Sequence, residues 1–251
     1  MSLLHQDKRI AEDEWFSRIL NRKTYRLAVP NGVDEGLRAS LAEIKKEVRN
    51  SALFIYAKVD VRELQGIRFL EEEGFHLVDT NVVFEKPVSR GPFPEPPCII
   101  RLATPADQNQ TVDLARRSFH ASRFHLDPQI GLEQANRLKA EWMQSFFLGK
   151  RGDQMVLAEE LGKITGFLLM MKMPDGAVLI DLIAVDSASR QKGTASAMIA
   201  FAQKTNPTAS SIRVGTQVAN VASIRLYEKL GFRLTQSQYV FHYHRAAPQF
   251  S

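Results

Sequence analysis

The segment Arg190–Ala195, with the sequence RQKGTA, lies between an apolar run that ends at Val185 and a stretch of small residues that predicts a helix. Gly193 has no side chain, so a ligand can approach the backbone closely there. The free N–H groups of the first helical turn carry about half a positive charge. Arg190 and Lys192 add cationic side chains nearby. Together these features favour binding of a pyrophosphate, and the alternative is an ordinary helix start.

A second segment with chemical potential, Asn220–Phe232, has the sequence NVASIRLYEKLGF. Tyr227 shares one helical face with Ile224 and Leu230 because each lies three residues away. We therefore expect a half-packed ring whose hydroxyl contacts water, which suits a proton donor. The alternatives are a core aromatic residue at Tyr227 and a simple helix cap at Asn220.

Taken together and in this order, the two segments resemble the GNAT N-acetyltransferase superfamily. Residues 179–195 are similar to its motif A, Arg/Gln-x-x-Gly-x-Gly/Ala after a strand that ends in Val, and residues 220–232 to its Asn-x-x-Ala-x-x-Leu-Tyr-x-x-x-Gly-Phe element. The resemblance implies a mixed α/β (α+β) GNAT fold, with a central mixed sheet flanked by helices. It also implies acetyl-CoA as co-substrate, no metal, and a strand that splays from its parallel neighbour beside the pantetheine arm.

The resemblance also implies roles for individual residues. The backbone amides from Gln191 to Ala195 would hold the CoA pyrophosphate, and Tyr227 would protonate the departing thiolate. The implied cofactor-binding residues are Leu182, Ile183, Ala184, Val185, Arg190, Gln191, Lys192, Gly193, Thr194, Ala195 and Asn220.

Acetyl transfer also needs a neutral amine. For an amine with the pKa of lysine, deprotonation at pH 7 costs about 4.6 kcal/mol, and a general base is typically worth about 10²–10⁴-fold in rate. Asp181 lies in an apolar strand pattern, where an ionised carboxylate is costly without a role or a partner. We therefore predict Asp181 as a catalytic residue, with a structural hydrogen-bonding role as an equal alternative. Glu159, Glu160 and a chain of waters are the other candidates for the base.

The segment from Phe119 to Pro128 holds the polar residues that we expect to bind the acceptor. The predicted substrate-binding residues are His120, Arg123, His125 and Asp127. In the fold that the sequence resembles, this region lines the acceptor pocket, and such side chains suit a polar, anionic acceptor. The spacing of the histidines and the aspartate could suggest a metal, but no supporting ligand set accompanies them, so no metal is predicted.

Several features look like the TDP-fucosamine acetyltransferases in particular: an extra N-terminal half, a Ser-Arg-Phe-His-x-Asp-Pro loop, a Trp-containing second helix and the run Val214–Asn220. This resemblance implies direct attack in a ternary complex by the 4-amino group of a dTDP-4-amino-4,6-dideoxyhexose, a nucleotide amino sugar for surface polysaccharide or antigen biosynthesis. The alternatives are another small amine, a peptide or protein amine, or a non-catalytic acyl-CoA-binding sensor. The long N-terminus and the tail His242–His244 depart from the pattern.

The elements that position these segments follow from the hydrophobic pattern. Helices are predicted over 14–20, 37–48, 61–73, 105–119, 132–148, 193–204 and 221–230. Strands are predicted over 24–28, 52–59, 75–84, 99–102, 154–159, 163–173, 177–185, 212–216 and 232–244. Dense prolines in 87–97 indicate a stiff linker. The chain therefore divides into an N-terminal half-domain (1–86), a linker (87–97) and a catalytic domain (98–251).

The N-terminal half contains an echo of the second segment. Ile67–Phe75 aligns with Ile224–Phe232, helix end, glycine and following aromatic included. However, Leu70 stands at the position of Tyr227, and no Arg-x-x-Gly-x-Ala turn precedes the echo. We therefore predict a truncated, degenerate GNAT-like β-α-β-α-β domain without the catalytic parts, and chance similarity of one helix end is the alternative.

Composition sets the remaining bounds. The chain has 251 residues, of which 44% are hydrophobic and 24% charged, as in ordinary globular proteins. Its net charge of +5 favours anionic ligands, but the basic residues are scattered, which argues against nucleic acid. Cys98 is the single cysteine, so no disulfide forms within the chain. With no secretory leader or membrane-spanning run, we expect a cytoplasmic protein that binds a small-molecule amine, no membrane, and a second copy in a homodimer.

Overall fold

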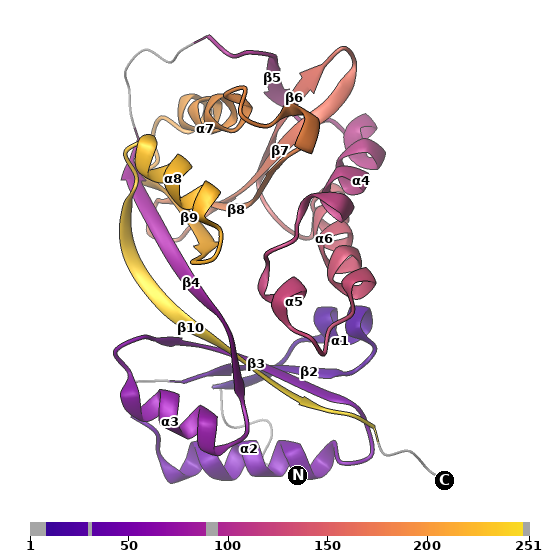
Figure 1. The fold of residues 1–251 in the computed structure, drawn as a ribbon, viewed down its shortest axis with the longest axis vertical. Coiled ribbons are helices and arrows are strands. Elements are labelled where there is room, and N and C mark those ends of the chain that lie inside the picture. Colours follow the sequence, from indigo (N-terminus) through magenta and orange to yellow (C-terminus); the bar gives the residue numbers. More distant parts are fainter. Residues whose placement is uncertain (1–8, 30–31, 89–94, 248–251) are drawn as a thin grey trace. The chain divides into compact units, whose positions relative to one another are not determined.

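The computed structural model describes residues 9–29, 32–88 and 95–247 (Figure 1). Most of the predicted proline-rich linker, residues 89–94, lies outside the described residues. No helix in the described ranges is long and apolar enough to cross a membrane.

The chain forms two compact units. The first unit contains residues 1–81, 126–130 and 236–251, and the second contains residues 82–125 and 131–235. This division differs from the predicted ranges 1–86 and 98–251, because two long strands, β4 (His76–Pro87) and β10 (Arg233–Arg245), each have residues in both units. It also places residues 126–130, part of the predicted acceptor segment, in the first unit.

In its described residues, the first unit is a mixed sheet with three helices. Its elements are β1 (Ile10–Glu12), α1 (Glu14–Leu20), β2 (Lys23–Ala28), α2 (Glu35–Glu47), β3 (Leu53–Asp60) and α3 (Leu64–Glu72), followed by the first part of β4 and, much later, the second part of β10. The strand order is β1-β2-β3-β10-β4, with β2 and β3 parallel and β10 antiparallel to β3. Strand β1 was not predicted, because three residues are too short to show an alternating pattern.

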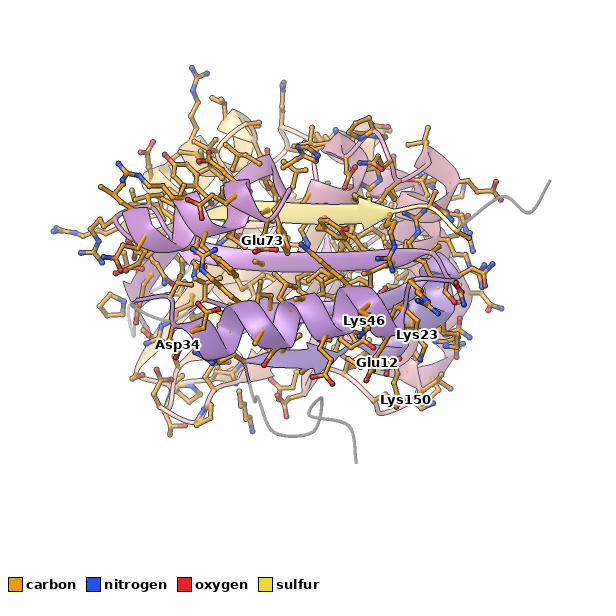
Figure 2. All side chains as sticks on the ribbon, turned by 90° about the horizontal axis from the view of Figure 1, so that it is seen from below. Glu12, Lys23, Asp34, Lys46, Glu73 and Lys150 are labelled. Carbon is orange, nitrogen blue, oxygen red and sulfur yellow. The ribbon has the colours of Figure 1, made fainter. Side chains whose placement is uncertain are left out.

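Side-chain alternation along β3 builds two faces in the first unit. Ile55 and Ala57 pack in one core with Leu41 of α2 and Phe69 of α3, and both helices lie on this face (Figure 1). Asp34 caps the start of α2 by accepting a hydrogen bond from the Leu37 amide at 2.8 Å. Figure 2 shows Asp34 at this end of α2 and Lys46 in its last turn, an arrangement that complements the helix dipole.

The second unit holds the predicted motifs. Its elements are the end of β4, β5 (Ile99–Leu102), a 3₁₀ turn (Pro105–Asp107), α4 (Gln108–Ser118), α5 (Arg123–Leu126), α6 (Leu132–Phe147), β6 (Gln154–Glu160), β7 (Lys163–Lys172), β8 (Val178–Val185), a second 3₁₀ turn (Ser187–Ser189), α7 (Thr194–Thr205), β9 (Ser211–Gln217) and α8 (Val221–Lys229). The strand order is β4-β9-β8-β7-β6-β5, with β5 to β8 antiparallel and β8 parallel to β9. The mixed α and β class is therefore confirmed.

Alternation along β6 again separates two cores. Val156 packs with Met198 of α7, whereas Leu157 packs with Leu114 of α4 and Met143 of α6. Helix α7 thus covers one face of the second unit's strands, and α4 and α6 cover the other (Figure 1). Strand β8 contributes to both cores, with Ile180 in the first and Leu182 in the second, which fits its largely apolar sequence.

The two helix ends that align in sequence also share their geometry. Gly74 and Gly231 both have φ +81°, in the left-handed region that favours glycine. The amide of Phe75 donates to the Leu70 carbonyl at 2.9 Å, and the amide of Phe232 donates to the Tyr227 carbonyl at 2.9 Å. The echo is therefore a match of backbone conformation as well as of residue types.

Candidate functional site

The central feature of the second unit is the separation of β8 from β9. Their parallel ladder contains three residue pairs, from Val178↔Ile212 to Ile180↔Val214, although the strands continue to Val185 and Gln217. On its other side, β8 stays paired with β7 as far as Val185. The backbone of residues 182–185 therefore lies outside the β8–β9 ladder, as the predicted splay requires, and its N–H and C=O groups on that side can bond a ligand.

A β-bulge marks the point where the ladder ends. The pairing of β7 with β8 shifts from Met170↔Ile180 to Leu169↔Leu182, so Asp181 is an extra residue without a partner. Bulges bend a strand and redirect its side chains, and they recur next to functional sites. The bulge gives a physical cause for the divergence of β8 from β9.

The turn after β8 has the backbone of an anion-binding site. Gln191 has φ +64° and Gly193 has φ +85°, and both residues are exposed. Among the described residues, the amides of residues 191–196 donate to no backbone acceptor, since the first such bond is from the Ala197 amide to the Gly193 carbonyl. Consecutive free amides at a helix start form a nest for phosphate oxygens. A side chain on Gly193 would meet nothing within 4 Å, so the space above it is open.

Three of the predicted cofactor-binding side chains have structural partners. Arg190 donates from Nε to the Val185 carbonyl at 3.1 Å and so ties the turn to the end of β8. Thr194 is buried and donates to the Ser189 carbonyl at 3.4 Å. Asn220 caps α8, because its Oδ1 accepts from the Ser223 amide at 3.3 Å. Contacts of these residues with a cofactor stay a prediction.

Tyr227 is buried more deeply than the sequence predicts. Its exposed fraction is 2%, and its ring packs against Phe84 at 5.8 Å and Phe232 at 5.7 Å between centroids. The prediction of a half-packed ring with its hydroxyl in contact with water is therefore wrong. Phe84 of β4 and Phe232, the residue before β10, cover the ring. Burial raises the pKa of the Tyr227 hydroxyl, so it keeps its proton at neutral pH and could donate it.

Asp181, at the bulge, is held by two side chains. Its carboxylate accepts hydrogen bonds from Arg151 Nε at 2.6 Å, from Arg151 Nη2 at 2.7 Å and from Trp142 Nε1 at 2.8 Å. The guanidinium of Arg151 also lies over the Trp142 ring, 4.2 Å from its centroid. Both carboxylate oxygens are thus occupied, and Asp181 would have to release a donor to take a proton from an amine.

The other two candidate carboxylates are also engaged. Glu159 accepts from Arg101 Nε at 2.8 Å, and Glu160 accepts from the Ser189 hydroxyl at 3.3 Å. In the part of the chain that the structure describes, neither carboxylate is held on both oxygens as Asp181 is, so both stay candidates for the base.

Lys139 of α6 is a residue that the sequence analysis missed. Its exposed fraction is 6%, and its Nζ lies over three rings, 4.7 Å from the centroid of Phe119, 4.9 Å from Trp142 and 6.0 Å from Phe124. Burial, reinforced by the charge of Arg123, lowers the pKa of Lys139 from 10.5 to about 7. The sequence does hold a signal for this burial. Lys139 lies four residues after Ala135 and four before Met143, which places it on the apolar face of the helix.

The predicted acceptor residues fall into separate surroundings. His120 is exposed, and Arg123 lies over the neighbouring Phe124 ring at 4.5 Å. His125 lies between the Ser122 hydroxyl, 2.6 Å from Nδ1, and Asn136 Oδ1, 3.0 Å from Nε2. A carboxamide oxygen only accepts, so Nε2 carries the hydrogen and Nδ1 accepts from the hydroxyl. Burial lowers the pKa of His125, which favours the neutral ring.

Asp127 does not join these residues. It belongs to the first unit, where its buried carboxylate contacts His242 and His244 of β10. The four residues predicted to bind the acceptor therefore form no single cluster. Sequence proximity placed Asp127 with His125, whereas its partners lie more than a hundred positions away.

Comparison with known proteins identifies the family. Residues 110–232 match the model of the acetyltransferase (GNAT) family. The chain belongs to this family. GNAT enzymes use acetyl-CoA as co-substrate, so the protein is an acetyl-CoA-dependent N-acetyltransferase with a small-molecule acceptor.

Relatives of this GNAT protein extend over most of its length. The spore coat polysaccharide biosynthesis protein SpsD of Bacillus subtilis (strain 168) is 27% identical over 235 residues, which cover 91% of this chain and 80% of SpsD. A GCN5-related N-acetyltransferase from Sphaerobacter thermophilus has a TM-score of 0.65 at 15% identity, covering 96% of this chain and 78% of its own. A tandem GNAT protein from the clavulanic acid biosynthesis pathway has a TM-score of 0.61 at 14% identity, covering 91% and 76%. These likenesses confirm the predicted GNAT fold.

Proposed function

We propose that this N-acetyltransferase acetylates the 4-amino group of a dTDP-4-amino-4,6-dideoxyhexose, by direct attack in a ternary complex, for synthesis of a surface polysaccharide. The observation that supports the acceptor is the relationship to SpsD, which is described as a polysaccharide biosynthesis protein. The cationic side chain of Arg123 in the second unit supports an acceptor that carries phosphates.

The donor half of the reaction follows from the turn and the splayed strand. The free amides of residues 191–196 would hold the pyrophosphate of acetyl-CoA, with Arg190 and Lys192 beside it. The open backbone of residues 182–185 would bond the pantetheine arm, and Asn220, the cap residue of α8, would contact the cofactor as well. Acetyl-CoA supplies an acyl group activated as a thioester.

Proton transfer is assigned to residues of the same unit. Tyr227 holds its proton at neutral pH and would give it to the departing thiolate. Asp181, at the bulge where the β8–β9 ladder has ended, stays a candidate for the base, but its hydrogen bonds with Arg151 and Trp142 favour action through a bound water over direct contact with the amine. Glu159 and Glu160 stay as alternatives for the base.

The first unit is proposed to be a degenerate second GNAT copy. The matched helix ends at Gly74 and Gly231 support a common origin, and the likeness to a tandem GNAT protein fits it. Leu70 stands in this copy where the second unit has Tyr227, so no catalytic role is assigned to the first unit. A homodimer and a cytoplasmic location stay predictions.

Release of free CoA thiol from acetyl-CoA tests the proposal. The acceptors would be dTDP-4-amino-4,6-dideoxyhexoses, simple polyamines and lysine-containing peptides, with a dTDP-hexose that has a 4-hydroxyl group as the matched control. We expect turnover with an amino sugar nucleotide and none with the hydroxyl analogue. Turnover of polyamines or peptides without any of the sugar nucleotides would contradict the proposed acceptor.

A further inference from the structure

Lys139 is a buried amine that has no polar partner. Its exposed fraction is 6%, and across the described stretches of the chain its Nζ takes part in no hydrogen bond and no ion pair. Its contacts are instead with the rings of Phe119, Phe124 and Trp142, whose centroids lie 4.7, 6.0 and 4.9 Å from Nζ. Lysine is almost never buried unless its charge is paired, so this residue calls for a role that justifies its position.

Lys139 lies on a side of α6 that connects a predicted acceptor residue with the bulge in β8. Asn136, Lys139 and Trp142 are spaced three residues apart, so they share this side of the helix. Asn136 Oδ1 lies 3.0 Å from Nε2 of His125, and Trp142 Nε1 donates to Asp181 at 2.8 Å. All five residues belong to the second unit. Lys139 is therefore placed between the residue predicted to bind the acceptor and the open backbone that follows the bulge.

The surroundings of Lys139 favour its neutral form. Burial lowers the pKa of Lys139 most, Arg123 lowers it further, Asp181 raises it and Arg151 lowers it, so that it falls from 10.5 to about 7. The nearby His125 is also held neutral, because burial lowers its pKa. An amine with a pKa near the ambient pH is an effective proton acceptor. The π faces of the three rings attract an ammonium group, so they stabilise the form that exists after a proton has arrived.

Two other roles fit these observations less well. A purely structural residue in this apolar space needs no amino group, since an aliphatic side chain would fill it without the cost of burying a charge. A residue that binds an anion must carry a charge, and the surroundings of Lys139 disfavour its charged form. Asp181, the neighbouring candidate for the base, has both carboxylate oxygens engaged by Arg151 and Trp142.

We propose that Lys139 is a catalytic residue that accepts a proton from the acceptor amine. The inference rests on the proposed function and deepens it, because Lys139 takes the role for which Asp181, Glu159 and Glu160 were candidates. The acceptor enters as an ammonium ion and gives one proton to the lone pair of Lys139 Nζ. The neutral nitrogen then attacks the thioester carbon, and a C–N bond forms as the C–S bond breaks.

The remaining protons of this step also balance. The attacking nitrogen loses its second proton to water, and the departing thiolate takes a proton from Tyr227, which recovers one from water. Lys139 then releases its proton to solvent and is ready for another turnover.

The test measures thiol release between pH 5.5 and 9 with saturating acetyl-CoA and any amine that is turned over. Lys139→Met removes the basic nitrogen. Lys150→Met is the matched control, because Lys150 is an exposed lysine of the same unit. Urea unfolding of each variant separates a loss of rate from a loss of folding. The readout is the ratio of the wild-type kcat to the kcat of Lys139→Met, in which the titration of the acceptor amine itself cancels.

A general base typically contributes about 10²–10⁴-fold, so we expect Lys139→Met to lower kcat by at least about 10²-fold at pH 8. KM for acetyl-CoA should stay within about twofold, because the thioester is bound elsewhere. Lys139 accepts a proton only when it is neutral, so the ratio should rise with pH up to about 7 and level off above it. Lys150→Met should keep the rate and the pH profile of the wild type.

A folded Lys139→Met whose kcat stays within about threefold of the wild type would overturn the proposal. A ratio that does not change with pH would do the same, because it would indicate a structural role. A ratio that falls as the pH rises through 7 would assign the function to the ammonium form and would also overturn it. Failure of every sugar nucleotide would count only against the proposed acceptor, because any other amine that releases thiol serves equally for the pH profile.

Discussion

Replacing Lys139 by methionine should stabilise the protein at neutral pH. Methionine is apolar and matches lysine as far as Cε, so it can occupy the space beside Phe119, Phe124 and Trp142 without the ammonium group. A pKa lowered from 10.5 to about 7 means that the folded state disfavours the charged form by about 5 kcal/mol, at ~1.36 kcal/mol per tenfold change. Contacts of the ammonium with the rings return about 1–2 kcal/mol. We therefore expect Lys139→Met to gain about 2–4 kcal/mol.

The pH dependence follows from the direction of this shift. Between pH 7 and 10.5 the unfolded chain binds a proton at Lys139 that the folded chain has lost, so the stability of the wild type rises with pH in this window. The advantage of Lys139→Met should be complete below pH 7 and should disappear as the pH approaches 10.5.

Urea unfolding at pH 6.5, 8 and 9.5, followed by tryptophan fluorescence, measures both effects. Lys150→Met is the control, since Lys150 is exposed at the end of the turn after α6 and is labelled in Figure 2. Its effect should stay within about 0.5 kcal/mol at every pH. If Lys139→Met were no more stable than the wild type at pH 6.5, or if its advantage did not shrink at pH 9.5, the account of a buried, uncompensated ammonium would be refuted.

Three further substitutions test the site. Tyr227→Phe should lower kcat by about 10²–10⁴-fold and leave the Kd for CoA nearly unchanged, and an unaltered kcat would remove Tyr227 from the mechanism. Gly193→Val should weaken CoA binding, measured by calorimetry, because φ +85° costs a β-branched residue about 1–2 kcal/mol; equal affinity would argue against the amide nest. Asp181→Asn should cost about 2–4 kcal/mol in urea unfolding, because it leaves Arg151 with a neutral partner; wild-type stability would contradict the role of this ion pair.

The donor site could be predicted from the sequence because its parts are local. The strand, the turn and the helix start follow one another within residues 178–205, and Gly193 is required by a backbone angle of that same turn. The bulge at Asp181 had no such signal, since it depends on the register between β7 and β8. The partners of Asp181 come from α6 and from the loop that follows it, and a pattern of single residues does not encode this meeting.

The acceptor side shows where local sequence misleads. His120, His125 and Asp127 lie within one short segment, which suggested one cluster, yet Asp127 pairs with His242 across 115 positions. For a similar reason the burial of Tyr227 was misjudged and Lys139 was missed. Helical spacing predicts which face of a helix a residue lies on, but not how completely neighbouring elements cover it. Phe84 covers Tyr227, and Phe119 covers Lys139.

Strand β10 gives a structural reason why the protein has a first unit to which no chemistry is assigned. This strand begins directly after the helix that carries Tyr227, and its later residues, among them His242 and His244, pair with β3 of the first unit. The same unit supplies Arg22, which contacts His244, and Phe54, whose ring packs against His242, and both histidines contact Asp127. Loss of β2 and β3 would therefore leave eight paired residues of β10 without their partner strand and Asp127 without its supporting ring and guanidinium. On this argument the first unit is retained because its strands pair with β10 and surround Asp127, a role that requires no catalytic tyrosine.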